Sequence, residues 1–100
     1  MGETMKVEKL IDIISKLSSY EDDELTIYVV EPWTCDSNAI IAQEPEEGGI
    51  PPEAKGIEAT YFIEIFIAID VLEGWKANVK REIPLREQCE RLIYYAIYDA

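Results

Sequence analysis

The side chains best suited to chemistry in this chain are carboxylates, because its 100 residues include 21 Asp and Glu, 9 Lys and Arg, and no histidine. Without histidine the chain lacks the commonest general acid–base group, the usual activator of Ser and Cys nucleophiles, and the commonest zinc ligand. It also contains no P-loop, dinucleotide-binding, zinc-protease or hydrolase-nucleophile motif. We therefore expect a protein that is not an enzyme and that has no cofactor and no metal site.

Glu64 has the most unusual setting of these carboxylates, since it lies inside the apolar run YFIEIFIAI. Alternation along a strand predicts that Glu64 shares a face with Phe62 and Phe66, while Tyr61 lies on the opposite face. Burial there would raise the pKa of Glu64 and make it a candidate general acid or base. The alternative, which the sequence favours, is a salt bridge or hydrogen bond to an Arg, Lys or Tyr.

Four adjacent acids, Glu21, Asp22, Asp23 and Glu24, follow the first predicted helix. The EF-hand spacing and its turn glycine are missing, so the pattern favours a solvated turn over a calcium site. The helix macrodipole disfavours acids at a helix C-terminus, which indicates some other use for these side chains.

The charge of the chain, formally −12, is confined to one region. Residues 1–20 are balanced and residues 65–100 carry a net charge of −1, whereas residues 21–64 hold twelve acids and a single base, Lys55. Such a chain has no basic footprint for nucleic acid or an anionic membrane. Two interpretations stay open: a solvated acidic surface without a partner, or a surface that attracts a basic protein by its field.

The second interpretation assigns partner binding to the acids of the predicted turns and loops. They are Glu21, Asp22, Asp23, Glu24, Glu31, Asp36, Glu44, Glu46, Glu47 and Glu53. Trp33 lies among them, either as an apolar interface anchor or packed over the edge of the core.

In size, acidity and lack of catalytic motifs, the chain resembles small bacterial immunity and inhibitor proteins. That resemblance is one of composition and covers no motif. It implies a protein that neutralises a basic toxin, nuclease or other nucleic-acid-binding protein by occlusion, as an immunity protein or a nucleic-acid mimic such as a phage anti-defence factor.

A second surface is predicted on the last helix, where Tyr94 and Tyr98 fall opposite the apolar stripe. Exposed tyrosines are enriched at interfaces. This face is either a homodimer seam, which would make the chain an oligomeric subunit or adaptor, or a face covered by another part of the fold.

The two cysteines, Cys35 and Cys89, have neither metal-ligand nor redox-motif spacing. We expect free thiols in a cytoplasmic protein, with a single disulfide as the alternative. The N-terminal segment is interrupted by charges and is not typical of a signal peptide, and no apolar run is long enough to span a bilayer.

The elements that must position these residues follow from periodicity and turn signals. The first half predicts one helix over residues 4–19 with Thr4 as its N-cap, strands over 25–30 and 37–43, and a long loop over 44–58.

The second half predicts a central strand over residues 59–68 and a helix over 71–80, in which Asp70 and Glu73 form a capping box. A last helix begins at Pro84. The order is α-β-β-β-α-α, which predicts a single α+β domain of residues 1–100 with a three-stranded antiparallel meander packed against helices.

Overall fold

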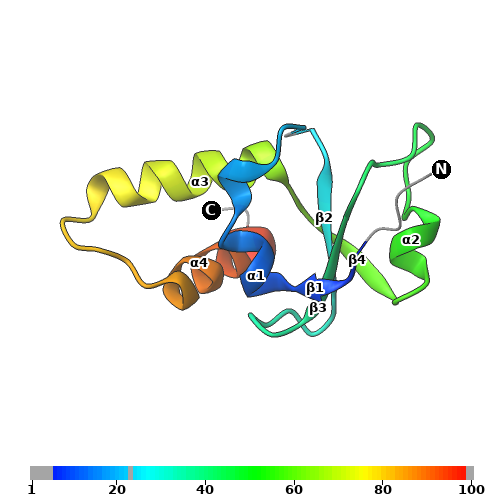
Figure 1. The fold of residues 1–100 in the computed structure, drawn as a ribbon, viewed down its shortest axis with the longest axis horizontal. Helices are drawn as coiled ribbons and strands as arrows, with labels where there is room; N and C mark the ends of the chain where they lie inside the picture. The colour runs from blue at the N-terminus through cyan, green and yellow to red at the C-terminus, as the bar shows by residue number, and fades with distance from the viewer. Residues whose placement is uncertain (1–5, 23, 99–100) are drawn as a thin grey trace.

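Four short strands form one antiparallel sheet in the computed structural model, which describes residues 6–22 and 24–98 (Figure 1). They are β1 (Glu8–Lys9), β2 (Thr26–Val30), β3 (Asn38–Ala42) and β4 (Ala59–Glu64), in the spatial order β1-β3-β2-β4. The α+β class and the antiparallel pairing are confirmed, but the sheet has one strand more than predicted.

The predicted meander is wrong, because β4 pairs with β2 and not with β3. Both β3 and β4 are antiparallel to β2, so they run in the same direction with β2 between them. Strands that run in the same direction need a crossover connection, and residues 43–58 supply it. The predicted loop is therefore a crossover, and it contains the short helix α2 (Pro52–Lys55).

The N-terminal segment is not the single helix that its periodicity predicts. It forms β1, the short helix α1 (Leu10–Ile14) and a 3₁₀ turn, η1 (Leu17–Ser19), while the proposed cap Thr4 lies outside the described residues. The backbone N–H groups of residues 10 and 11 donate to the carbonyl oxygens of Ser37 and Cys35, both at 2.9 Å. These hydrogen bonds join the N-terminal segment to the loop of the β2–β3 hairpin, and α1 begins at the first of the two donors.

The apolar run that was predicted as one strand is half strand and half helix. β4 ends at Glu64, and α3 (Ile65–Asn78) begins at the next residue. Asp70 lies in the interior of this helix and is exposed, so the predicted capping box is wrong. The buried residues of α3 are Ile65, Ala68 and Leu72. Their spacing of three and four positions is that of one helix face, and a near-continuous apolar run contains this spacing as well as that of a strand.

A β-bulge in β4 changes which side chains share a face. The pairing with β2 shifts between Ile27, opposite Ile63, and Tyr28, opposite Tyr61, which leaves Phe62 as the extra residue. Phe62 and Ile63 are both only 3% exposed and both belong to the main core.

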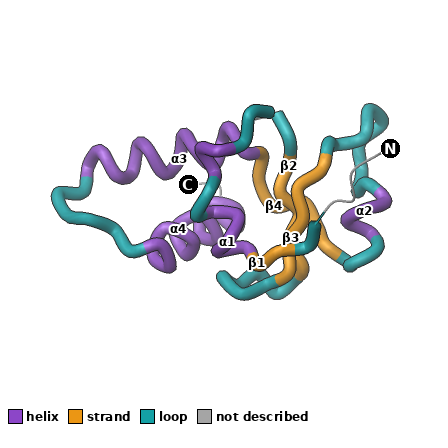
Figure 2. The backbone as a smooth tube through the Cα atoms, in the orientation of Figure 1, coloured by secondary structure: helices purple, strands orange, loops and turns teal. Residues whose placement is uncertain are grey.

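The helices cover the sheet unequally. Figure 2 shows α1, α3 and α4 (Leu85–Tyr98) on one side of the strands and α2 on the other. The main core fills the first interface, and a smaller core of Tyr28, Ile40, Ala42, Ala54 and Ala59 fills the second. The start of α4 agrees within one residue with the helix predicted from Pro84.

Candidate functional site

The start of β2, the end of β3 and the end of β4 lie at one end of the sheet, and most of the described acids that the sequence predicts for partner binding lie beside them. Thr26 pairs with both Ala42 and Glu64, so the turn before β2, the loop after β3 and the end of β4 are neighbours. The described acids at this end are Glu21, Asp22, Glu24, Glu44, Glu46, Glu47 and Glu64, and we call them the acidic sheet end. Asp23, predicted with them, lies outside the described residues.

Local backbone bonds shape the turn before β2. The N–H of Glu24 donates to the carboxylate of Asp22 at 3.1 Å, and the N–H of Leu25 donates to the carbonyl oxygen of Asp22 at 3.4 Å. An aspartate that caps its own turn in this way is a common turn former. The carboxylates of Glu21 and Glu24 remain exposed.

The loop after β3 turns at two glycines. Gly48 and Gly49 have φ values of 83° and 88°, a left-handed conformation that glycine adopts at little cost. The N–H of Gly48 donates to the carbonyl oxygen of Pro45 at 2.9 Å, which closes the turn. Glu46 and Glu47 lie within this turn and are exposed.

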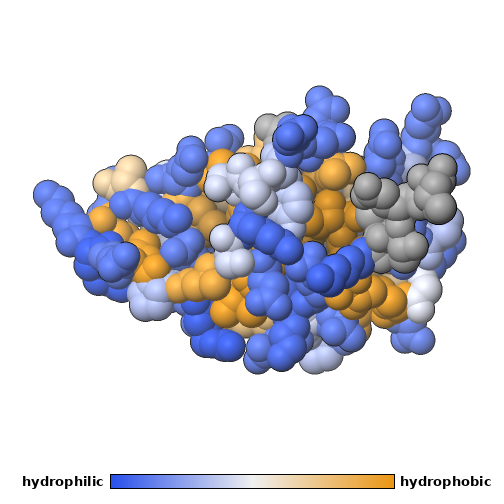
Figure 3. Space-filling model, in the orientation of Figure 1, coloured by the Kyte–Doolittle hydropathy of each residue, from blue (hydrophilic) through white to orange (hydrophobic). Residues whose placement is uncertain are grey.

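Hydrophilic atoms cover both projections on the upper side of the space-filling view, with hydrophobic atoms between them (Figure 3). Figure 1 places residues 20–22, residues 24–25 and the 43–50 segment there. The ion pairs of the described residues involve other acids, Glu8, Asp36 and Glu87. None of these three ion pairs involves a carboxylate of the acidic sheet end, and its carboxylates, which carry like charges, repel one another.

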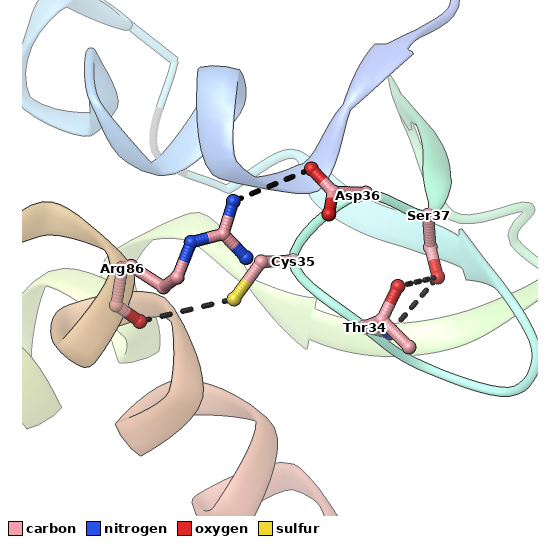
Figure 4. A network of polar contacts seen from close by, with 5 residues as sticks. All are labelled: Thr34, Cys35, Asp36, Ser37 and Arg86. Atoms are coloured by element: carbon pink, nitrogen blue, oxygen red, sulfur yellow. Dashed lines mark hydrogen bonds and ion pairs between the residues drawn. The ribbon is translucent and has the colours of Figure 1, made fainter.

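The predicted partner surface is not one surface, since Glu31, Trp33 and Asp36 lie at the opposite end of the sheet. They belong to the loop of the β2–β3 hairpin, and antiparallel pairing places that loop away from the start of β2 and the end of β3. Asp36 is moreover 3.5 Å from the guanidinium of Arg86 (Figure 4), so part of its charge is compensated.

Trp33 packs over the edge of the core. Its indole N–H donates to the carbonyl oxygen of Val29 at 3.2 Å, and its ring meets that of Phe62 edge-on, with centroids 5.0 Å apart. The side chain is half-buried. Of the two interpretations of Trp33, packing at the core edge is the one that the contacts bear out.

Glu64 finds a tyrosine as its partner, as the sequence favoured, but not on the predicted face. The hydroxyl of Tyr61 donates to Oε2 of Glu64 at 3.1 Å, and both side chains lie on the α2 side of the sheet because of the bulge at Phe62. Burial first, and then this hydrogen bond, raise the pKa of Tyr61 from 10.0 to about 12.

Two buried hydroxyls that the sequence did not single out lie beside this pair. Tyr28 and Thr26 are 0% and 1% exposed, and neither hydroxyl makes an aligned hydrogen bond in the described structure. The rings of Tyr28 and Tyr61 meet edge to face, with centroids 6.2 Å apart. Burial raises the pKa of Tyr28, and the carboxylates of Glu44, Glu53 and Glu64 raise it further.

Glu53, the remaining acid predicted for partner binding, is exposed on α2, and its negative charge contributes to the raised pKa of Tyr28. Carboxylates from the loop after β3, from α2 and from β4 therefore all act on the hydroxyl of Tyr28, which is itself buried.

Tyr94 and Tyr98 form an exposed face of α4. They are 52% and 63% exposed, their ring centroids are 4.6 Å apart, and Ile97 beside them is 55% exposed. The guanidinium carbon of Arg91 lies 5.6 Å from the centroid of the Tyr94 ring. The described part of the fold does not cover this face.

Within residues 6–22 and 24–98, no group of three or more Cys, Asp or Glu is arranged to hold a metal ion. No helix in the same ranges has the length and hydropathy to cross a membrane. No protein-family model matches the chain, and neither a curated protein nor a solved structure matches it significantly.

Proposed function

We propose that this chain is a non-enzymatic binding protein whose acidic sheet end docks onto a basic surface of a protein partner. The observation that carries the proposal is the strand register, in which Thr26 lies between Ala42 and Glu64 and so gathers the acids of three segments at one end. The residues proposed for binding are Glu21, Asp22, Glu24, Glu44, Glu46, Glu47, Glu53 and Glu64. Glu31, Trp33 and Asp36 are left out because they lie at the other end of the sheet.

The proposed mechanism is occlusion. Carboxylates gathered at one end occupy the Lys and Arg side chains with which a basic protein holds phosphate, as an immunity protein or a nucleic-acid mimic would do. The long-range field speeds the encounter, so association should be fast at low salt and slow steeply as salt is added.

The test compares two sets of four neutral substitutions with the same change in net charge. The first set, at the acidic sheet end, is Glu21→Gln, Glu44→Gln, Glu46→Gln and Glu47→Gln. The matched control, on α3, on α4 and between them, is Asp70→Asn, Glu73→Gln, Glu82→Gln and Glu90→Gln. A partner captured at low salt by the wild-type chain is then used to measure association rates and competition with nucleic acid.

We expect the first set to slow association about tenfold or more, in line with electrostatic steering, and the control set to slow it much less. Nucleic acid should compete with the wild-type chain for the partner. Equal slowing by both sets would mean that only net charge matters and would overturn the assignment of the surface. An association rate that does not change with ionic strength would overturn the mechanism.

A second candidate function is an oligomeric subunit or adaptor that uses the exposed face of α4. It is supported by the exposure of Tyr94, Ile97 and Tyr98, three large side chains at i, i+3 and i+4 of one helix. Sedimentation velocity at micromolar concentration tests it. A dimer that Tyr94→Ser and Tyr98→Ser together dissociate would support this function, and a monomeric wild-type chain would count against the homodimer.

A further inference from the structure

The two cysteines, 54 positions apart in the chain, meet in the main core. Cys35 belongs to the loop between β2 and β3, and Cys89 belongs to α4. Sγ of Cys35 lies 3.8 Å from the carbonyl oxygen of Arg86, a contact drawn in Figure 4, and Cys89 belongs to the same core cluster as Cys35. Arg86 and Cys89 are three positions apart and so are neighbours on one face of α4, and the contact with Arg86 therefore places the Cys35 sulfur beside the face that carries Cys89.

Both side chains are buried as free thiols, but their access differs. A cavity of about 310 Å³ opens beside Cys35, with Trp33 and Arg86 among its lining residues. Cys89 is not part of that lining and is 0% exposed. A small molecule that enters the cavity therefore meets Cys35 first.

We propose that Cys35 and Cys89 form an intramolecular disulfide when the protein meets a small-molecule disulfide such as oxidised glutathione. In the first step, the Cys35 thiol loses its proton to solvent and its sulfur attacks one sulfur of the oxidant. This step forms a mixed disulfide and releases one small thiolate.

In the second step, the Cys89 thiol loses its proton and its sulfur attacks the Cys35 sulfur, which releases the second small thiolate. The two protein thiols are thus oxidised by two electrons, and the small disulfide is reduced to two thiols. Burial, followed by the contact with Cys35, raises the pKa of the Cys89 thiol. The second step therefore follows the first slowly, because only the thiolate attacks.

The new bond would link the hairpin loop to α4, two segments that meet through side-chain packing, the Cys35 contact with Arg86 and the exposed ion pair of Asp36 with Arg86. A cross-link between distant segments restricts the unfolded chain and shifts unfolding to higher denaturant. This proposal is independent of the proposed function, since Cys35 and Cys89 lie away from the acidic sheet end.

The experiment treats the folded full chain with oxidised glutathione, blocks the remaining thiols with an alkylating reagent and maps the peptides by mass spectrometry. We expect a peptide pair joined through Cys35 and Cys89, monomeric protein, and a higher urea midpoint that dithiothreitol reverses. The variant Cys89→Ala should stop at a glutathione adduct on Cys35. The variant Cys35→Ala should leave Cys89 unmodified.

Three results would overturn the proposal: unreacted thiols in the folded protein, adducts on both cysteines without a cross-link, or a covalent dimer. A cross-link that forms only in urea would overturn it as well, because it would not depend on the folded contact. Circular dichroism shows whether each variant is folded, and the mapping of the wild-type chain decides the question even where a variant is not.

Discussion

The contact between Tyr61 and Glu64 depends on one extra residue in β4. In a regular strand these side chains would point to opposite faces, because their spacing is odd. The bulge at Phe62 turns both toward α2 and leaves Phe62 and Ile63 in the main core. One local irregularity thus decides both the partner of Glu64 and the packing of two large apolar side chains.

We expect Tyr61→Phe to lower the free energy of unfolding by about 1 kcal/mol at neutral pH, since it removes one hydrogen bond to a carboxylate. The pKa of Tyr61 is raised by folding, so the neutral hydroxyl is favoured in the folded state. Its contribution is complete below pH 10 and is lost as the pH rises toward about 12. Urea denaturation over this range should therefore show a smaller loss of stability in Tyr61→Phe than in the wild-type chain.

Tyr98→Phe, which removes an exposed hydroxyl from α4, is the matched control and should leave the pH profile unchanged. If Tyr61→Phe lost stability with pH as steeply as the wild-type chain, the hydroxyl of Tyr61 would not be the group that titrates.

Residue types and their positions in the chain predicted part of the site. They predicted the acidic loops and a tyrosine or cation as the partner of Glu64. They did not predict the bulge, because Phe62 and Ile63 suit either face of a strand and only their packing against the helices decides between them. For the same reason they did not predict the group formed by Thr26, Tyr28 and Tyr61.

The junction between β4 and α3 has no signal in the sequence that would predict it. Residues 59–69 are apolar almost throughout, so neither a period of two nor a period of 3.6 stands out. The N–H of Ile65 still donates to the carbonyl oxygen of Leu25 at 2.9 Å, next to the last pair of the sheet. The change from strand to helix occurs there, without a glycine, a proline or a side-chain cap.

Replacing Asp70 tests this junction. Within α3, Asp70→Ala substitutes a strong helix former at an exposed position and should stabilise the protein by about 0.5 kcal/mol. An N-cap role would instead make the same change destabilising by about 1 kcal/mol. Urea denaturation measures the sign of the change in stability, which distinguishes Asp70 inside α3 from Asp70 as the N-cap of a later helix.

Glu73→Ala is the control within the same helix. Glutamate is already a good helix former, so this change should alter stability less than Asp70→Ala does.

The predicted strands over residues 25–30 and 37–43 and the last helix agree closely with β2, β3 and α4. The strands are predicted from their apolar and β-branched residues, and the helix from its 3.6 period after Pro84. β1 could not be predicted in this way. It has only two residues, Glu8 and Lys9, and it exists because they pair with Ala39 and Asn38. That pairing depends on where α1 packs, which no local pattern contains.

The fold places most of the net negative charge away from α3 and α4, because the acids and bases of residues 65–100 nearly balance. The acidic sheet end gathers on three neighbouring segments, while the basic side chains Lys76, Lys80, Arg81, Arg86 and Arg91 lie on or between α3 and α4. The sequence predicts the uneven distribution of charge along the chain. It does not predict which acids lie at which end of the sheet, because that depends on how the strands pair.

We expect added monovalent salt to raise the melting temperature by a few degrees, because it screens the repulsion among these acids. The four substitutions at the acidic sheet end should reduce this salt effect more than the four control substitutions on and between α3 and α4. Thermal denaturation at low and high sodium chloride measures both. If the two sets reduced the effect equally, the repulsion would be spread over the whole surface.

The pairing of β4 with β2 has a consequence during synthesis. The β2–β3 hairpin leaves the ribosome before residues 59–64 do, and until they arrive the free side of β2 is an open strand edge with apolar side chains. An open strand edge of this kind can pair with a strand of another nascent chain. The acids of the acidic sheet end before β2 and after β3 flank that edge and would repel a second copy, so these charges would disfavour aggregation of the nascent chain.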